Sequence, residues 1–357
     1  MHDPIKQEMM QAFEAFYDSY WYVLGDKVKQ FETEYAQFNQ TEYAVGISNG
    51  LDALHIALVT LGIGKGDEVI VPSNTYIATA LAVSYVGATP IFVEPNIETY
   101  NIDPNKIESA ITSKTKAIMP VHLYGQACEM EAIKAIADKH KLFIIEDNAQ
   151  SQGATYNNRF TGTWGDINGT SFYPGKNLGA LGDAGAITTN NKELAQKAMV
   201  FRNYGSQKKY YNDVIGYNMR IDECQASLLS VKLKHLNNWT QKRKEIANWY
   251  IEALSDINQI ILPKTASNAS HVYHLFVIRT NLRDDLQKHL NESEIGTLIH
   301  YPIPPHLQLA YAHLGHQKGD FPVAEEIADT CLSLPMWPGM TKEMVEHISI
   351  VIKHFFR

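Results

Sequence analysis

The sequence predicts an α/β protein with a mainly parallel, two-sided sheet, followed by a smaller α+β domain. Two observations predict the sheet: between residues 43 and 189, short apolar runs of strand length alternate with helical segments, and several runs end in polar or glycine-rich turns. A change to a mixed pattern beyond about residue 235 predicts the second unit. We therefore expect a large domain at 1–235 and a small C-terminal domain at 236–357, a division that a chain of 357 residues allows.

The first two elements are helices, expected at residues 5–24 and 26–38. In the second, Val28, Phe31 and Tyr35 recur at spacings of three and four, so one face of the helix is apolar. A mostly parallel seven-stranded sheet flanked by helices follows. Its strands are expected at 43–47, 68–71, 91–93, 117–122, 142–145, 169–173 and 186–189, and its helices from Leu51 onward and at 76–86, 104–112, 129–140 and 192–204.

The remainder of the chain is expected to leave the sheet. Residues 205–217, rich in tyrosine, glycine and asparagine, predict an extended loop, and residues 222–254 predict one long helix at the domain boundary. The smaller domain mixes both kinds of element. Its strands are expected near 260–262, 272–279 and 297–300, and its helices near 284–291, 323–332 and 342–356.

Composition excludes several classes of function. The net charge of −8, from 31 basic and 39 acidic residues, gives no electrostatic footprint for nucleic acid. The 14 histidines are dispersed, so no metal site is expected. No run approaches the roughly 18 apolar residues of a membrane span, and the N-terminus lacks the apolar core of a signal peptide. Three scattered cysteines fit a reduced compartment, and we expect a cytoplasmic protein without membrane or nucleic-acid partners.

One acidic and one basic residue indicate the chemistry. The apolar run 142–145 ends in Glu146 and Asp147, at the carboxyl end of a strand, where open α/β sheets bind ligands. Lys176 lies in a glycine-flanked turn after the next strand. A lysine can hold an aldehyde cofactor as a Schiff base and an aspartate can pair with a pyridinium nitrogen, which together indicate pyridoxal phosphate. From these two residues alone, a turn-capping Asp147 and a solvated Lys176 explain the pattern equally well.

Other positions at the same rim support a cofactor with a phosphate and a flat ring. The turn Ser48-Asn49-Gly50 between a strand and a helix predicts either an anion site, using the free amides of Gly50 and Leu51, or a simple N-cap. Tyr76 follows a strand end and could stack on a ring or pack at the start of its helix. Gln150 and Ser171 are further candidates, for the ring and the phosphate, with a solvated turn and a local backbone hydrogen bond as the alternatives.

Seven motifs in order carry a resemblance to a known family. They are SNGLDALHIAL, PSNTYIATALA, HLYGQ, EDNAQSQGA, SFYPGKNLGALGDAGAI, IGYNMRIDECQA and IHYPIPPHLQ. Together they resemble the nucleotide-sugar aminotransferases of the DegT/DnrJ/EryC/StrS family, within the fold type I pyridoxal phosphate enzymes. The resemblance runs from about residue 5 to the C-terminus. Some relatives replace the lysine with histidine and act as dehydratases, and Lys176 argues against that branch.

The resemblance implies roles for individual residues. Lys176 would bind the cofactor and move the proton between cofactor and substrate carbons, and Asp147 would pair with the pyridine nitrogen. The implied cofactor contacts are Gly50, Leu51, Tyr76, Asp147, Gln150, Ser171 and Asn218. Family members are usually homodimers with shared active sites, so Asn218 is expected to reach the phosphate of the partner's cofactor. Arg220 is expected either at that interface, near the substrate, or in a structural ion pair.

The resemblance also indicates a substrate. Residues 299–308 and the phrase KKYYNDVIGYN are most similar to enzymes that aminate carbon 3 of a dTDP-linked 3-oxo-6-deoxyhexose. Tyr301 and His306 could then touch the sugar or its diphosphate, with packing of the proline-rich turn as the alternative. Glutamate is the commonest amino donor in the family. Amination at carbon 4 of a dTDP- or UDP-4-oxo sugar is the second choice.

Two rival functions fit the sequence less well. A nicotinamide-dependent oxidoreductase should carry G-x-G-x-x-G after its first strand, and Ser48-Asn49-Gly50-Leu51-Asp52-Ala53 lacks those glycines. A non-catalytic pyridoxal phosphate-binding regulator would be expected to add a nucleic-acid-binding domain. The chain offers no basic segment for one, and an intact Lys176 favours catalysis.

Overall fold

The computed structural model describes residues 3–357, so the first two residues of the expected large domain lie outside the described residues. Its centre is the predicted sheet, with strand order β3-β2-β4-β5 in one part and β8-β9-β1 in the other. A parallel bridge between Asp147 and Gly169 joins the two parts into one sheet of seven strands, in which only β9 runs antiparallel to its neighbours. The strands are β1 (Tyr43–Ile47), β2 (Glu68–Pro72), β3 (Thr89–Val93), β4 (Thr115–Ile118), β5 (Phe143–Ile144), β8 (Asn168–Ser171) and β9 (Gly185–Thr189).

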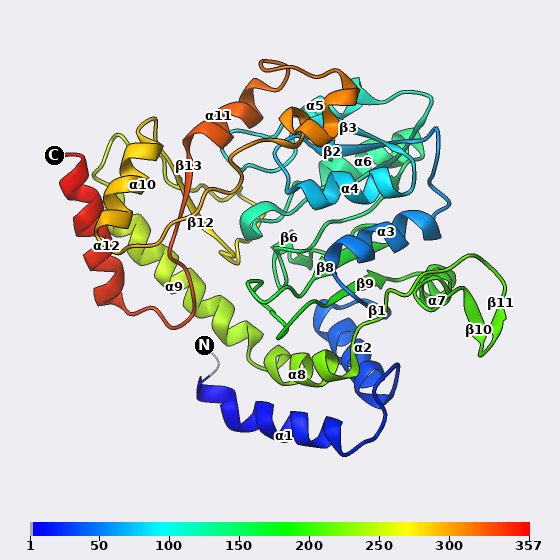
Figure 1. Cartoon of the computed structure of the whole chain (residues 1–357). Helices are drawn as coiled ribbons and strands as arrows, with labels where there is room; N and C mark the ends of the chain where they lie inside the picture. The colour runs from blue at the N-terminus through cyan, green and yellow to red at the C-terminus, as the bar shows by residue number, and fades with distance from the viewer. Residues whose placement is uncertain (1–2) are drawn as a thin grey trace.

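Helices cover both faces of this sheet because neighbouring residues along a strand point to opposite sides and both sides are apolar. Val69 and Val71 of β2 lie in one core and Ile70 lies in another. The first core is covered by α3 (Gly50–Thr60), α4 (Ile77–Tyr85) and α7 (Lys192–Phe201). The opposite face is covered by α5 (Pro104–Ile107) and α6 (Met130–His140) at one end, and by α2 (Asp26–Asn39) and α8 (Glu223–Leu233) at the other (Figure 1).

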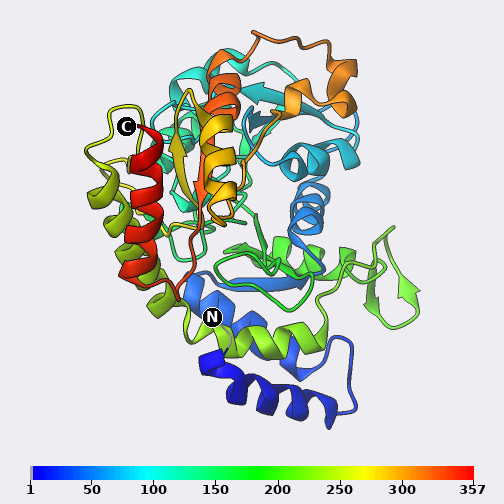
Figure 2. The same cartoon turned by 60° about the vertical axis from the view of Figure 1, so that its left-hand side comes forward.

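The first helix is shorter than the predicted 5–24. Helix α1 spans Lys6–Tyr17, after a short η1 (Asp3–Ile5), and lies along α8 in both views (Figures 1 and 2). The chain leaves the helix because Tyr20 and Leu24 adopt positive φ angles of 54° and 50°, which no right-handed helix contains. The segment between α1 and α2 is therefore a loop with exposed aromatic side chains, Trp21 among them.

The predicted helix 222–254 is two helices, α8 and α9 (Leu236–Leu254), broken at residues 234–235. Helix α8 is buried on almost every side, between α1, α2 and the sheet, and α9 turns away to pack against the C-terminal elements (Figure 2). Because the chain breaks here, α8 can pack against α1, α2 and the sheet while α9 packs against the C-terminal elements, which one straight helix could not do. The boundary expected at residue 235 coincides with it, and the division into domains stays a prediction.

The C-terminal part has its own apolar core. The antiparallel strands β12 (Phe276–Arg279) and β13 (Cys331–Leu334) pack with α9, α10 (Arg283–Glu292) and α12 (Lys342–Phe355). The strands predicted at 260–262 and 297–300 are reduced to single bridges, and the helix predicted at 323–332 is α11 (Pro322–Thr330), which gives way to β13. Leu332 and Leu334 of β13 lie in this core. Their burial beside β12 explains why residues 331–334 form a strand although the local pattern predicts a helix as far as residue 332.

Small elements complete the described chain. Two hairpins were not predicted: β6 (Thr155–Tyr156) with β7 (Arg159–Phe160), and β10 (Ser206–Lys208) with β11 (Tyr211–Asn212), within the segment expected as loop. Short 3-10 turns are η2 (Glu108–Ala110), η3 (Leu123–Gly125), η4 (Pro305–Leu307) and η5 (Leu309–Leu314). None of the helices within residues 3–357 is both long and apolar enough to cross a membrane.

Candidate active site

The predicted site residues gather at the carboxyl ends of the parallel strands. Asp147 lies three residues after β5 and bridges Val121, just past β4, on one side and Gly169 of β8 on the other. Its neighbour Glu146 points elsewhere: the buried Glu146 carboxylate accepts from the amides of Gly162, Trp164 and Gly165. Only Asp147 of the acidic pair is therefore available to a ligand at this rim.

The Asp147 carboxylate is buried and held in one orientation. Thr79 Oγ1 of α4 donates to Oδ2 over 2.8 Å, and the amide of Ala149 donates to Oδ1 over 3.1 Å. Burial raises the pKa of Asp147, and both hydrogen bonds and the charge of Lys176 oppose that rise because they favour the carboxylate. A buried carboxylate with so few donors is suited to a cationic N–H partner.

Lys176 lies close enough to Asp147 for their charges to interact, although burial dominates its behaviour. Burial lowers the pKa of Lys176 to about 8, and the negative charge of Asp147 raises it in part. The neighbouring imidazoles of His274 and His300 have pKa values lowered by burial and by Lys176, that of His300 to about 4. Both rings are therefore neutral near neutral pH, and the amine of Lys176, although still mostly protonated there, has a larger neutral fraction than an ordinary lysine.

The first turn of α3 forms an anion site against β8. Asn49 caps the helix by accepting from the amide of Asp52 over 2.9 Å, and within the described chain the amides of Gly50 and Leu51 donate to no protein acceptor. A Cβ at Gly50 would lie 2.5 Å from Cβ of Ser171, so the missing side chain permits this close approach. Two free amides at a helix N-terminus beside a serine hydroxyl suit a phosphate.

Tyr76, Gln150 and Tyr301 form a connected group, although Tyr301 comes from a distant segment. The rings of Tyr76 and Tyr301 lie 5.1 Å apart between centroids, tilted by 36°. Gln150 Nε2 donates to the Tyr301 hydroxyl over 3.1 Å, and Gln150 Oε1 accepts from the amide of Tyr124. The chain thus brings these three predicted residues together with Asp147, whose charge reaches Tyr301.

Asn218 and Arg220 lie beside the anion site. Their segment pairs with the end of β1, through a bridge between Ile47 and Arg220 and a hydrogen bond from the amide of Ser48 to the carbonyl of Met219. Arg220 Nη1 donates to Asn203 Oδ1 over 3.0 Å, and its guanidinium lies over the ring of Tyr204. Asn218 is exposed in the single chain.

His306 is buried beside Glu325 and Phe321. Its side chain is fully buried, Nε2 lies 3.0 Å from Oε1 of Glu325, and its ring packs 4.7 Å from that of Phe321. Glu325 also accepts from the amide of Gly319. The structure thus shows His306 packed within the proline-rich segment, the alternative that the sequence left open, and a substrate contact at His306 stays a prediction.

Sequence reasoning missed three residues that the fold brings to the site. Thr79 lies one helical turn after Tyr76 on α4, and that spacing could have indicated it. His274 and His300 come from the C-terminal part of the chain and meet Lys176 only through the fold. Nothing in the local pattern around either histidine indicates that neighbour.

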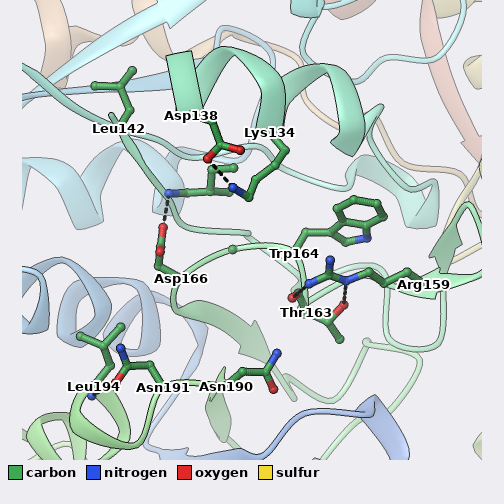
Figure 3. A pocket seen from close by; sticks show the side chains of 12 residues that line it. Lys134, Asp138, Leu142, Arg159, Thr163, Trp164, Asp166, Asn190, Asn191 and Leu194 are labelled. Carbon is green, nitrogen blue, oxygen red and sulfur yellow. Dashed lines mark hydrogen bonds and ion pairs between the residues drawn. The ribbon is translucent and has the colours of Figure 1, made fainter. Parts of the chain in front are cut away.

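A separate surface cavity of about 330 Å³ lies at the other end of β5 (Figure 3). Its charged groups have partners within the chain: Lys134 pairs with Asp138, Asp166 accepts from the amide of Ile144, and Arg159 donates to Thr163 and lies over the ring of Trp164. No group of three or more potential metal ligands occurs within residues 3–357. The rim around Asp147 and Lys176 therefore remains the candidate active site.

Comparisons with known proteins agree with this location. The family described as "DegT/DnrJ/EryC1/StrS aminotransferase family" matches residues 3–353. The dTDP-3-amino-3,6-dideoxy-alpha-D-galactopyranose transaminase of Aneurinibacillus thermoaerophilus is 52% identical over 350 residues, which cover 98% of this chain and 96% of the relative.

Solved structures extend the match to three dimensions. The crystal structure of Streptomyces venezuelae DesV in complex with a ketimine intermediate superposes with a TM-score of 0.98 at 44% identity, over 100% of this chain and 96% of that one. NtdA from Bacillus subtilis, solved with bound cofactor PMP, gives a TM-score of 0.91 at 35% identity, over 98% and 82% of the two chains. The predicted α/β fold of type I is confirmed, and the chain belongs to the DegT/DnrJ/EryC1/StrS family as a pyridoxal phosphate-dependent nucleotide-sugar aminotransferase.

Proposed function

We propose that this aminotransferase moves the amino group of an amino acid, L-glutamate as first choice, to carbon 3 of a dTDP-linked 3-oxo-6-deoxyhexose. The observation that carries the reaction type is the buried pair of Lys176 and Asp147 at the carboxyl ends of β5 and β8. The choice of carbon 3 is supported by the 52% identical relative, which is named for a 3-amino-3,6-dideoxy sugar. The motif at residues 299–308 supports the same choice.

The residues at the rim fit pyridoxal phosphate. The buried Asp147 carboxylate would accept from the pyridine nitrogen, and the free amides of Gly50 and Leu51 with the Ser171 hydroxyl would hold the phosphate. Tyr76 and Gln150 would lie against the ring. When bound, the cofactor supplies an aldehyde carbon for amine exchange and a conjugated ring that withdraws electrons from it.

The side chains of this chain supply proton transfer and orientation. With a pKa of about 8, Lys176 has a larger neutral fraction near neutral pH than an ordinary lysine, so the same amine can accept a proton from one carbon and return it to another. Thr79 and the Ala149 amide hold the Asp147 carboxylate in place for an N–H donor. The Tyr301 hydroxyl, fixed by Gln150, faces the same space and is our proposed contact to the sugar. Arg220 is a second proposed contact.

One site must accept the donor and the oxo sugar in turn, which requires ping-pong kinetics. We further infer that the enzyme acts as a homodimer, with the exposed Asn218 reaching the phosphate site of the second subunit. A cytoplasmic location is inferred from Cys128, Cys224 and Cys331, all free thiols. Recovery of the native protein in a membrane or secreted fraction would contradict that location.

The decisive experiment identifies the carbon that receives nitrogen. Purified enzyme is incubated with ¹⁵N-labelled glutamate and a panel of dTDP- and UDP-linked 3-oxo and 4-oxo sugars, and each product is assigned by NMR. We expect ¹⁵N at carbon 3 of a dTDP sugar and none with Lys176→Ala. Product labelled only at carbon 4 would replace the proposed substrate with the second choice and leave the enzyme class unchanged.

A further inference from the structure

A buried lysine outside the candidate site contacts the turn that carries Lys176. Lys232, in the last turn of α8, has no exposed surface. Its Nζ donates to the carbonyl of Gly179 over 2.5 Å, and within the described chain no carboxylate lies within ion-pair distance of it. Lysines are rarely buried without a charged partner, because removal of the amine from water is costly.

The bond is made at the base of the turn. The amide of Ala180 donates to the carbonyl of Phe172 over 2.7 Å, which closes residues 172–180 into a loop. A Cβ at Gly179 would lie 2.4 Å from the carbonyl oxygen of Pro174, so the two sides of this loop touch. Lys232 therefore binds the backbone three residues after Lys176, where the loop is narrowest.

Helix α8 holds the same segment a second time. Gln225 Oε1 accepts from the amide of Leu181 over 2.8 Å, and Asn177 is tied on its other side to the carbonyl of Val272. The buried Lys232 amine supplies the donor for the Gly179 carbonyl, and an apolar side chain of similar size would leave that carbonyl without this partner. Burial lowers the pKa of Lys232 to about 8, because a charged amine is disfavoured away from water.

We propose that Lys232 is a positioning residue for the reaction: its hydrogen bond to the Gly179 carbonyl fixes the 172–180 turn and with it the location of the Lys176 amine opposite Asp147. The inference rests on the role proposed for Lys176. It assigns to Lys232 no contact with substrate or cofactor. Its effect is expected on kcat, since a displaced Lys176 amine transfers protons less well, while substrate KM is preserved.

The test compares Lys232→Met, which keeps the chain length and removes the donor, with Ser227→Ala as the control. Ser227 lies on the same helix, is buried, and donates to the carbonyl of Ala12, away from the turn. Hydrogen exchange is measured on the full-length protein at the amides of Lys176 and Ala180, which donate within the turn. Lys232→Met is expected to speed exchange at both amides by about tenfold, and Ser227→Ala to leave both unchanged.

The second readout is the pH titration of the visible absorbance of cofactor-loaded protein. We expect its midpoint to move in Lys232→Met and to match wild type in Ser227→Ala, although both variants melt at lower temperature. Wild-type exchange and an unmoved midpoint in Lys232→Met would overturn the proposal. Wild-type protein that shows no Lys176-dependent absorbance would instead overturn the role proposed for Lys176, and the exchange data would still test Lys232.

Lys232→Gln keeps the test decisive if the methionine variant does not fold. Glutamine retains an N–H donor and is one bond shorter than lysine, so it is expected to weaken the bond to Gly179 and speed exchange by about threefold. Its kcat should fall between those of wild type and a non-bonding variant, with KM unchanged. Exchange at Lys176 and Ala180 identical to wild type in Lys232→Gln would count against the proposal.

Discussion

At the scale of single residues, the site depends on two opposed charges that burial weakens in different ways. Burial lowers the pKa of Lys176 and raises that of Asp147, so each group is pushed toward its neutral form, and each is partly restored by the charge of the other. Thr79 adds a hydrogen bond that favours the carboxylate. The Lys176 amine therefore loses its proton more readily than an ordinary lysine, while the Thr79 hydrogen bond and the charge of Lys176 favour the ionised form of Asp147.

The first prediction concerns the reactivity of the Lys176 amine. Only the neutral amine reacts with electrophiles, and its fraction rises with pH, so labelling of Lys176 in cofactor-free protein should show a midpoint near pH 8. Ordinary surface lysines should titrate at about 10.4. Because the Asp147 charge raises the pKa of Lys176, Asp147→Asn should move the midpoint below that of wild type. Peptide mass spectrometry after brief labelling measures both, and an unshifted midpoint in Asp147→Asn would contradict the coupling.

The second prediction concerns Thr79, which the sequence did not reveal. Thr79→Val removes the hydroxyl that lowers the pKa of Asp147, so that pKa should rise and the acidic limb of the kcat/KM profile should move to higher pH. We expect about a tenfold loss of kcat at neutral pH, against a hundredfold or greater loss in Asp147→Asn. Ser84→Ala, on the same helix and bonded to Tyr311 instead, is the control and should leave the pH profile unchanged.

At the scale of elements, function depends on how helix ends and strand ends meet. The N-terminus of α3 approaches Ser171 of β8 so closely that a single methyl group would not fit. The η4 segment, in contrast, is held by the contact between the buried side chains of His306 and Glu325. The first contact shapes the proposed phosphate site, and the second holds the proline-rich segment in the fold.

The third prediction tests the anion site at α3. Gly50→Ala should weaken pyridoxal phosphate binding by about tenfold or more, because its Cβ displaces either the first turn of α3 or Ser171. Binding of pyridoxal, which lacks the phosphate, should change much less. Ser171→Gly removes the obstacle, so adding Gly50→Ala to it should cost little more. Equal losses for both ligands, measured by fluorescence titration, would place the phosphate elsewhere.

The fourth prediction distinguishes His306 from Tyr301. His306→Gln should lower the free energy of unfolding by about 1–3 kcal/mol, because Glu325 loses a buried partner, and should leave the sugar KM within about twofold of wild type. Tyr301→Phe should change the kinetics with a small effect on stability, since only its bond to Gln150 is lost. Denaturant unfolding and steady-state kinetics measure both. A raised KM without destabilisation in His306→Gln would restore its predicted role in substrate binding.

At the scale of the whole molecule, one sheet collects residues that are far apart in sequence. The parallel bridge at Asp147 and Gly169 joins two halves of the sheet, and the carboxyl ends of their strands share one rim. The C-terminal part adds Tyr301, His300 and His274 to that rim. The proposed second subunit would add Asn218 of its own chain, which a single chain leaves exposed.

The fifth prediction tests that shared site by complementation. Lys176→Ala and Asn218→Ala are each expected to be nearly inactive alone. If the two residues act in one site from different subunits, co-refolded mixtures should regain up to about one quarter of wild-type activity, since half of the dimers are mixed and one of their two sites is intact. Two Lys176→Ala preparations refolded together are the control. No recovery in mixtures that form dimers would show that both residues serve a site within one chain.

The sequence by itself determined the alternation of strands and helices, the turn that presents Lys176, the acid at the end of β5 and the family to which the chain belongs. These features can be recognised from local patterns. A strand that is buried on both faces is apolar along its length, and the polar residues that bind a ligand follow its carboxyl end. The strands and helices of the sheet are accordingly confirmed, with shifts of a few residues at their ends.

Only the tertiary structure decided which distant residues meet. Tyr301 contacts Gln150, Lys232 binds Gly179, and His306 contacts Glu325. The partners of each pair are far apart in sequence, so no local sequence pattern predicts these contacts. The break between α8 and α9 and the strand β13 likewise depend on what each segment packs against. The physical reason is that hydrophobic burial and hydrogen bonding act between surfaces, and those surfaces exist only once the chain has folded.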